Sequence, residues 1–299
     1  MDSGVHIPLA KQTLRSVVKR FMEEECDSHD GGRWELIRLK AFLLHPKTAF
    51  VDKAIGHVTS EDISVWIEAR RKETSNSTAS RERGLLSGIF THAMKKWHIK
   101  LAMHPVRMTV APPSTKSRSR RVSAAELATV KNYALTQPTG LTVKWYICVM
   151  FQLAVETGLR LKELTRIQPA HVHTDEKWLY VMPSKNGDDR QVPLSTRAIE
   201  LLAMADNQFP IKVGTAGTTW KRLFADLGFV NLHFHDSRHE ACTMLSKIYT
   251  VLELAKIIGH RDLRSLMIYY NPTGSELAMK MHAWTPPTPP RPLLPTAVS

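Results

Sequence analysis

Two histidines, an arginine and a tyrosine near the carboxyl-terminal end of the sequence have the spacing needed to meet around one phosphate. His235 and Arg238 are three residues apart, so they share one face of a helix. Gly259 follows an apolar run, where a helix end favours a left-handed residue, and it places His260 just past that end. Tyr269 comes nine residues later. Such a set supplies protons, positive charge and a nucleophile, which are the requirements for breaking a phosphodiester.

This order of residues resembles the carboxyl-terminal signature of the tyrosine recombinases, the phage integrase family. The family pattern is His-x-x-Arg, then Leu-Gly-His, then a tyrosine nine residues on. It stands here as His235-x-x-Arg238, Ile258-Gly259-His260 and Tyr269. The resemblance predicts that an earlier arginine and a hairpin lysine should also be present.

Both of these earlier motifs can be found. The family's first catalytic motif is matched by Glu-Thr-Gly-Leu-Arg160-x-x-Glu163-Leu. Its β-hairpin motif is matched by Lys185-Asn-Gly-x-x-Arg190-x-Val-Pro-Leu, in which the Asn-Gly pair is typical of a hairpin turn. By the resemblance, Arg160 binds the scissile phosphate, Glu163 helps to hold the site together and Lys185 reaches the cleaved bond from the hairpin.

The chemistry that the resemblance implies is a transesterification. Tyr269 attacks a DNA phosphate and gives a 3′-phosphotyrosyl link and a free 5′-hydroxyl. Because the bond energy is kept in the protein–DNA link, no ATP, no metal and no other cofactor is expected. Arg160 and Arg238 are expected to bind the non-bridging oxygens of the phosphate. Lys185 would protonate the leaving oxygen. His235 would move the proton of the tyrosine, and His260 would donate a hydrogen bond to the phosphate.

Helical periodicity distinguishes the two adjacent tyrosines without help from the family. Leu263, Leu266, Met267 and Tyr270 recur at i, i+3, i+4 and i+7, so Tyr270 is expected to continue an apolar stripe into the core. Tyr269 points about 100° away from its neighbour on the same helix. A nucleophile must be reachable, so Tyr269 is the predicted nucleophile.

Each of these residues also has a purely structural interpretation. A lone histidine is more often a hydrogen-bonded core group, and an arginine three residues before a glutamate is more often a surface ion pair. The pairs His171-x-His173 and His233-x-His235 could suggest a metal, but no cysteine or carboxylate completes either set. The combined order and spacing favour a recombinase. A type IB topoisomerase that relaxes supercoils as a monomer and a DNA-binding protein that has lost catalysis are the alternatives.

Composition points to the same kind of partner. The formal net charge of +13 suits a polyanion, nucleic acid before an anionic membrane. Cys26, Cys148 and Cys242 lack paired spacing and are predicted to be reduced thiols. No basic segment followed by an apolar run is visible at the amino terminus, and the apolar stretch 145–155 is too short to cross a bilayer, so it is predicted to be a buried helix. We expect a cytoplasmic protein, bacterial or phage-encoded, that acts on double-stranded DNA.

The elements that must position these residues begin with a helical amino-terminal region. Residues 9–112 show helical apolar periodicity without a strand pattern, and Thr59 has the sequence context of a helix cap. Residues 58–99 are similar to the family's core-binding (SAM-like) domain, a helical clamp on one face of DNA, although His104-Pro105 replaces the usual Asn-Pro. In that pattern one helix faces the duplex through Thr78, Ser80, Arg81 and Arg83.

Residues 113–121 are predicted to link two domains. Proline, serine and basic side chains without an apolar residue cannot build a core. Because both flanking domains are expected to grip DNA, the linker should lie along the phosphates as a basic strap. Its candidate phosphate-binding residues are Lys116, Arg118, Arg120 and Arg121.

Residues 122–284 are expected to form the catalytic domain. A capping box at Ser123 starts its first helix, and Gly158 ends an apolar helix that begins near residue 141. Strands near 178–182 and 190–194 flank the hairpin, and further helices are expected at about 195–206, 217–227 and 274–284. The proline-rich residues 285–299 should be extended and poorly ordered. The predicted fold is therefore mainly α with a small β-sheet, a helical core-binding domain at 1–112 preceding a tyrosine recombinase catalytic domain.

The resemblance also implies an assembly. Members of the family act as tetramers on paired DNA sites, and an accessory DNA-bending protein can assist them. The arrangement found here resembles the simpler Xer-like members and argues against a second, arm-type DNA site. The motifs are compatible with integration, excision, inversion or dimer resolution.

Overall fold

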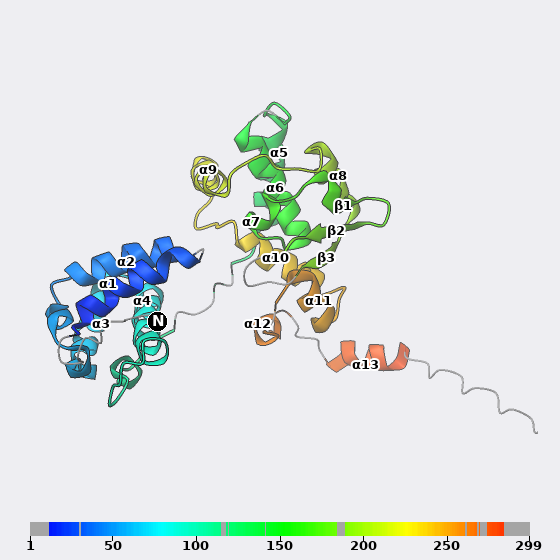
Figure 1. The fold of residues 1–299 in the computed structure, drawn as a ribbon. Coiled ribbons are helices and arrows are strands. Elements are labelled where there is room, and N and C mark those ends of the chain that lie inside the picture. The colour runs from blue at the N-terminus through cyan, green and yellow to red at the C-terminus, as the bar shows by residue number, and fades with distance from the viewer. Residues whose placement is uncertain are drawn as a thin grey trace, which may run out of the picture. The chain divides into compact units, whose positions relative to one another are not determined.

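The computed structural model describes residues 12–29, 31–114, 118, 120–140, 142–183, 189–260, 262–267, 269 and 274–283. The chain divides into two compact units, Met1–Ser117 and Arg118–Ser299 (Figure 1). Each unit has its own cluster of buried apolar side chains. The division falls inside the stretch predicted as a linker, while the proline-rich tail lies outside the described residues.

The described part of the first unit is built from helices. Thr59 forms a capping box at the start of one of them, as predicted, and Ser75 caps the next by accepting a hydrogen bond from the Thr78 amide. Ile89 and Phe90 are fully buried in the cluster that these helices enclose. The helices are α1 (Leu14–Glu24), α2 (Gly32–Leu44), α3 (Ser60–Glu73) and α4 (Asn76–Lys95), with short 3₁₀ turns at Cys26–Ser28, Ala49–Asp52, Ile55–His57 and Pro105–Met108.

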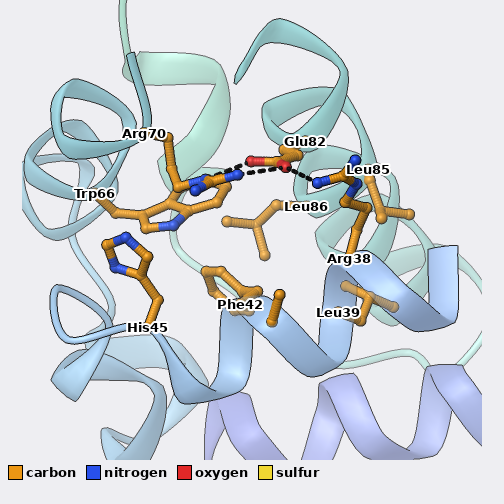
Figure 2. Close-up of a pocket in the computed structure, with 10 residues that line it drawn as sticks. Arg38, Leu39, Phe42, His45, Trp66, Arg70, Glu82, Leu85 and Leu86 are labelled. Atoms are coloured by element: carbon orange, nitrogen blue, oxygen red, sulfur yellow. Dashed lines mark hydrogen bonds and ion pairs between the residues drawn. The ribbon is translucent and has the colours of Figure 1, made fainter. Parts of the chain in front are cut away.

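A small pocket between α2, α3 and α4 contains a buried carboxylate held by two arginines (Figure 2). Glu82 is 7% exposed and accepts hydrogen bonds from Arg70 Nε at 2.8 Å and Nη2 at 2.9 Å. Arg38 Nη1 donates to the same carboxylate at 3.4 Å. Phe42 and Trp66 pack edge to face beside it. Because a buried carboxylate requires paired cations, this network ties the three helices together.

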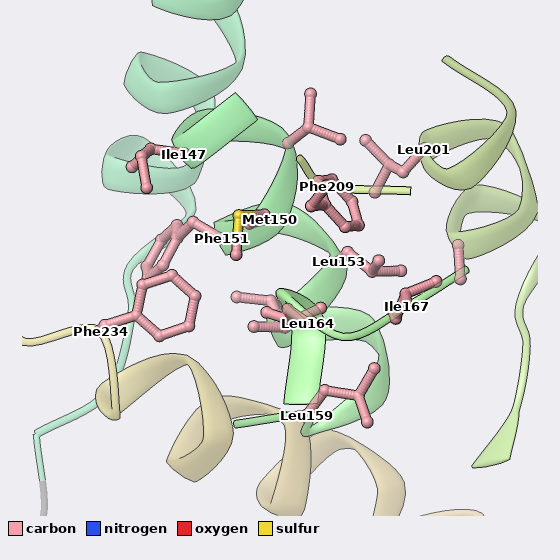
Figure 3. Packing of buried hydrophobic residues seen from close by; sticks show 14 of the residues in the cluster. Ile147, Met150, Phe151, Leu153, Leu159, Leu164, Ile167, Leu201, Phe209 and Phe234 are labelled. Carbon is pink, nitrogen blue, oxygen red and sulfur yellow. The ribbon is translucent and has the colours of Figure 1, made fainter. Parts of the chain in front are cut away.

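The second unit is organised around α6 (Val143–Thr157), which packs against α5 (Ala124–Leu135), α8 (Thr196–Met204) and α9 (Val213–Asp226). Nearly every residue of α6 from Trp145 onward is buried, which confirms the buried helix predicted for 145–155. The Phe151 ring contacts Trp220, Phe224 and Phe234. Figure 3 shows Phe151 and Phe234 next to each other in this core, where their rings meet edge to face. A helix that is apolar on all sides must be covered on all sides, and the surrounding helices cover α6 in this way.

A three-stranded antiparallel sheet lies in the described part of the second unit, in the order β1 (Val172–His173), β2 (Trp178–Val181) and β3 (Arg190–Pro193). Leu179 pairs with Val192, and both are fully buried. Strands β2 and β3 were predicted, whereas the two-residue β1 was not. The mainly α fold with a small sheet is confirmed. Lys185 lies outside the described residues.

The remaining described helices include those that carry or flank most of the candidate site residues. They are α7 (Leu161–Leu164), α10 (Asp236–Leu245), α11 (Val251–Ile258), α12 (Arg264–Met267) and α13 (Gly274–Ala283). The predicted apolar stripe of α12 is wrong in two positions, because Leu263 is 39% and Met267 is 55% exposed while only Leu266 is fully buried. A helix of a single turn presents one residue to the core and has no repeating face. Tyr269 follows in a turn, and Tyr270 lies outside the described residues.

Candidate active site

Arg238 lies at the centre of the candidate site, where the ends of two helices meet. Its side chain is buried, and it donates from Nη1 to the Gly158 carbonyl at 2.6 Å and from Nη2 to the Ile258 carbonyl at 2.7 Å. These carbonyls belong to the ends of α6 and α11, which stop because Gly158 and Gly259 both adopt a left-handed φ of 70°. Each terminal nitrogen of Arg238 has a second N–H that can bind a further acceptor.

Burial makes Arg238 an unusual cation. Burial lowers the pKa of Arg238 to about 10, with the positive charge of Arg160 as the next cause. The negative carboxyl-terminal ends of α6 and α11 oppose this effect, since their carbonyls face the guanidinium. Arg238 is therefore protonated at neutral pH and fixed in place by the backbone.

Glu163 holds a second pair of arginines. It accepts from Arg160 Nη1 at 2.8 Å and from Arg190 Nη1 and Nη2 at 3.1 and 2.9 Å. Arg190 is buried and also donates from Nε to the Ile257 carbonyl at 2.8 Å. Burial acts to raise the pKa of Glu163, but the hydrogen bond and charge of Arg190, followed by those of Arg160, lower it below its ordinary value. Glu163 is therefore an anion that orients Arg160, whose side chain is 40% exposed.

The two histidines of the predicted set are kept neutral. Burial lowers the pKa of His260 to about 4, followed by the charges of Arg238 and Arg160. His235 immediately precedes α10 and is exposed, yet partial desolvation and the charge of Arg238 also lower its pKa. The influence of the same two arginines on both imidazoles shows that these four side chains belong to one cluster.

Tyr269 joins this cluster through a histidine that was not predicted. Its hydroxyl is in hydrogen-bond contact with Nδ1 of His239, on α10 next to Arg238. Burial raises the pKa of Tyr269 to about 12. The tyrosine is half-buried and packs against the hydrophobic core of the second unit. The predicted nucleophile is thus held by the helix that carries Arg238.

Arginines at the start of the second unit bind carboxylates of α10. Arg118 donates from Nε and Nη2 to both oxygens of Asp236, at 2.5 and 2.8 Å, and Asp236 is fully buried. Arg121 binds both oxygens of Glu240 in the same way, at 2.6 and 2.8 Å. Burial acts to raise the pKa of Asp236, but Arg118 lowers it below its ordinary value. These pairs fix the helix on which Arg238 and His239 stand.

The predicted basic strap therefore has partners within the protein. Arg120 pairs with Glu126 of α5 and also donates to the Val230 carbonyl at 3.2 Å. Phosphates would have to compete with carboxylates for Arg118, Arg120 and Arg121. Lys116, the remaining basic residue of the predicted linker, lies outside the described residues.

The predicted DNA-contacting residues of the first unit differ in their surroundings. Ser80 and Arg81 are exposed near the start of α4, and Thr78 is partly exposed. Arg83 is turned inward, where it donates to the Thr109 hydroxyl and carbonyl and to the Val106 carbonyl. Its guanidinium joins α4 to the following loop. Arg83 was predicted to contact DNA, and the sequence pattern gave no sign of these contacts within the protein.

The structure thus brings most of the predicted catalytic residues together. Sequence reasoning missed His239 and Asp236 and did not assign a role to Arg190, although all three flank or belong to the quoted motifs. His239 had a detectable signal, because it lies one turn after His235 on the same helix face. The residues that share the cluster are Arg160, Glu163, His235, Arg238, His260 and Tyr269.

Comparisons with known proteins show what the whole chain resembles. The model of the phage integrase family matches residues 120–276. A putative integrase/recombinase of Haemophilus influenzae is 31% identical over 279 residues, which cover 90% of this chain and 90% of that one. Among solved structures, the Tn1549 transposon integrase in complex with a circular intermediate DNA aligns with a TM-score of 0.73 and 13% identity, over 91% of this chain and 99% of that one. A lambda integrase tetramer bound to a Holliday junction aligns with a TM-score of 0.66 and 20% identity, over 88% and 83%.

The family model and the Haemophilus influenzae relative define the class of protein: an enzyme that cleaves and rejoins DNA strands. In the part of the chain that the structure describes, no helix has the length and hydrophobicity needed to cross a membrane. The chain belongs to the phage integrase family of tyrosine recombinases. Its activity is therefore site-specific DNA recombination, and the topoisomerase and inactive-protein alternatives are not favoured.

Proposed function

We propose that Tyr269 is the nucleophile of the recombination reaction. The observation that carries this proposal is the contact of its hydroxyl with α10, the helix that also holds Arg238. Attack forms a bond between the tyrosine oxygen and phosphorus and breaks the bond from phosphorus to the 5′-oxygen. The product is a 3′-phosphotyrosyl link and a 5′-hydroxyl. Attack by the 5′-hydroxyl of another strand reverses the step and joins the DNA in its new arrangement.

The charges around the tyrosine support a role in stabilising the phosphate. Arg160 is half-exposed and oriented by Glu163, so its fork can bind non-bridging oxygens in two-point contact. Arg238 contributes its remaining N–H groups from a fixed position, and neutral His260 donates a further hydrogen bond. Lys185, assigned by its motif alone, protonates the leaving 5′-oxygen. These cations take the place of a metal ion, so no metal is required.

We further propose that four copies act together on two paired DNA sites. Exchange between two duplexes requires each of four strands to be cut, and each chain supplies one tyrosine. The likeness in fold to a lambda integrase tetramer on a Holliday junction supports this assembly. Exposed Ser80 and Arg81 of α4, with Thr78, contact the DNA backbone from the first unit. An accessory DNA-bending protein and a cytoplasmic setting in a bacterium or an infected bacterium complete the proposal.

The test is capture of the covalent intermediate. The purified protein is incubated, in excess EDTA, with sheared genomic DNA from its source, and DNA that stays attached after denaturation is sequenced. The recovered site is then rebuilt with a nick beside the cleavage position, so that the short 5′-hydroxyl fragment diffuses away and religation is blocked. We expect a denaturation-resistant protein–DNA complex in EDTA.

Two phenylalanine variants form the matched pair for this test. Tyr269→Phe should abolish the complex, since the attacking oxygen is gone, whereas Tyr270→Phe should form it. The opposite pattern would move the nucleophile to Tyr270. Loss of the wild-type complex in EDTA, restored by magnesium or zinc, would contradict the metal-free mechanism.

A further inference from the structure

We propose that His239 is the general base that receives the proton of Tyr269. This inference rests on the proposed role of Tyr269 as nucleophile and adds a residue that the family motif does not assign here. The motif gives the tyrosine proton to His235, but the hydroxyl of Tyr269 is in hydrogen-bond contact with Nδ1 of His239. A candidate base must first be within hydrogen-bond reach of the proton that it takes, and His239 meets this requirement.

The position of His239 follows from the helix that carries it. It stands directly after Arg238 and four residues after His235, so the two histidines lie one turn apart. Their rings meet edge to face with centroids 5.4 Å apart, and the rings of His239 and Tyr269 are 6.1 Å apart. Arg238 is held by two backbone carbonyls, so His239 stands on a segment that cannot easily rotate away.

The protonation state suits a base. Burial lowers the pKa of His239, and the charges of Arg118 and Arg238 act in the same direction. Asp236 acts in the opposite direction but is itself paired with Arg118. His235, which also faces the ring, has a lowered pKa as well. The imidazole is therefore neutral at neutral pH, and in the tautomer that carries its proton on Nε2, Nδ1 offers a lone pair to the tyrosine hydroxyl.

Without a base, the tyrosine would seldom be in the deprotonated form that attacks phosphorus. Burial raises the pKa of Tyr269 to about 12, so at pH 7 only about one molecule in 10⁵ would carry the phenolate without help. Transfer of the proton to His239 during attack avoids that rare state. The bond from the tyrosine oxygen to phosphorus forms as the O–H bond breaks, the proton passes to Nδ1, and the 5′-oxygen leaves with a proton from Lys185. In the rejoining step His239 returns its proton to the tyrosine.

The first experiment needs no DNA. Side-chain ¹⁵N NMR of the full chain observes the His239 ring, whose signals are assigned by their loss in His239→Gln. Tyr269→Phe should shift the Nδ1 signal of His239, because the hydrogen bond from the hydroxyl is removed. His233→Gln, at an exposed neighbouring histidine, should leave it in place. An Nδ1 signal unaffected by Tyr269→Phe would refute the contact and the proposal with it.

The second experiment measures single-turnover cleavage of the nicked recombination site across a pH series. His239→Gln keeps a polar side chain of similar length but cannot take up a proton, so cleavage should fall by about 10²-fold or more while DNA binding is retained. The decline of wild-type cleavage at acidic pH, where the imidazole becomes protonated, should disappear in this variant. Cleavage within threefold of wild type, with the acid decline intact, would reduce His239 to a packing residue.

A modified substrate separates the base from the acid. Sulfur in place of the 5′-oxygen leaves without needing a proton, so this substrate should restore cleavage to Lys185→Ala but not to His239→Gln. If His235→Gln instead removes the acid decline, His235 is the base and the proposal is overturned. Failure of wild-type protein to form any covalent complex would refute the proposed function, whereas the NMR measurement would still decide the contact of His239 with Tyr269.

Discussion

Arg160 and Arg238, both expected to bind the scissile phosphate, differ in their surroundings. Arg238 is 3% exposed and donates to the ends of two helices, so it contributes to folding as well as to the site. Arg160 has a 40% exposed side chain and one carboxylate partner, Glu163. The same substitution should therefore have different consequences at the two positions.

Arg160→Lys should reduce cleavage strongly and leave folding stability nearly unchanged. Lysine keeps the charge but loses the two-point fork, and a half-exposed ion pair contributes less than about 1 kcal/mol. Arg238→Lys should reduce cleavage and also lower the free energy of unfolding by about 2–4 kcal/mol, since hydrogen bonds to two buried carbonyls are disturbed. Urea unfolding beside single-turnover cleavage gives both quantities. Near wild-type cleavage by either lysine variant would remove that arginine from the proposed phosphate site.

The lowered pKa of His260 predicts that the folded protein loses stability in acid. Its folded pKa is about 4, below the value of about 6.5 in an unfolded chain, so the folded state binds fewer protons. The stabilisation is thus complete above pH 6.5 and is lost as the pH falls towards 4, by up to about 3 kcal/mol. His260→Gln should flatten the dependence of the unfolding free energy on pH in this window. The matched variant His57→Gln, at an exposed histidine, should keep the wild-type slope.

At the scale of elements, Arg118 and Arg121 form a brace for α10. Arg118 and Arg121 each bind a carboxylate of that helix with two hydrogen bonds. Asp236 is fully buried, so removal of Arg118 would leave an uncompensated charge in the interior. This brace links the start of the second unit to the helix that carries Arg238 and His239.

Serine at Arg118, Arg120 and Arg121 together should therefore destabilise the second unit by about 2–4 kcal/mol. Because these guanidiniums already have carboxylate partners, the log–log salt slope of DNA binding should fall by much less than about 0.9 for each arginine replaced, which is the value for a cation that neutralises one phosphate. Arg81→Ser is the control, since its side chain is exposed and contacts the Trp34 ring from the surface, so it should change the slope with only a small loss of stability. If the slope falls by the full amount of about 0.9 for each arginine replaced and stability is unchanged, these arginines bind DNA phosphates as the predicted basic strap.

Much of this arrangement was accessible from the sequence, and the reasons are local. Gly158 and Gly259 mark helix ends through their own backbone freedom, and Thr59 caps its helix through neighbours three residues away. The pairing of Arg118 with Asp236 spans 118 residues and leaves no periodic trace. Arg83 was assigned to DNA by its position in a motif, but its direction depends on where the loop carrying Thr109 returns.

At the scale of the whole molecule, the two units have separate hydrophobic clusters. We expect urea unfolding to show two transitions. Leu86→Ala, at a position 2% exposed in the first unit, should lower one of them, and Leu153→Ala, at a fully buried position in the second, should lower the other. Each substitution should cost about 2–5 kcal/mol. Circular dichroism gives both midpoints, and a single transition shifted by both variants would show that the units unfold together.

The brace of α10 also bears on the order in which the chain is made and folded. Arg118 and Arg121 are synthesised 118 and 119 residues before Asp236 and Glu240. Contacts of such long sequence separation close large loops and form late in folding. During synthesis on the ribosome, α10 cannot be braced until the chain has emerged as far as Glu240. Fixing Arg238 also requires the Ile258 carbonyl, so it is a late event, after the first hydrophobic cluster and most of the second have been translated.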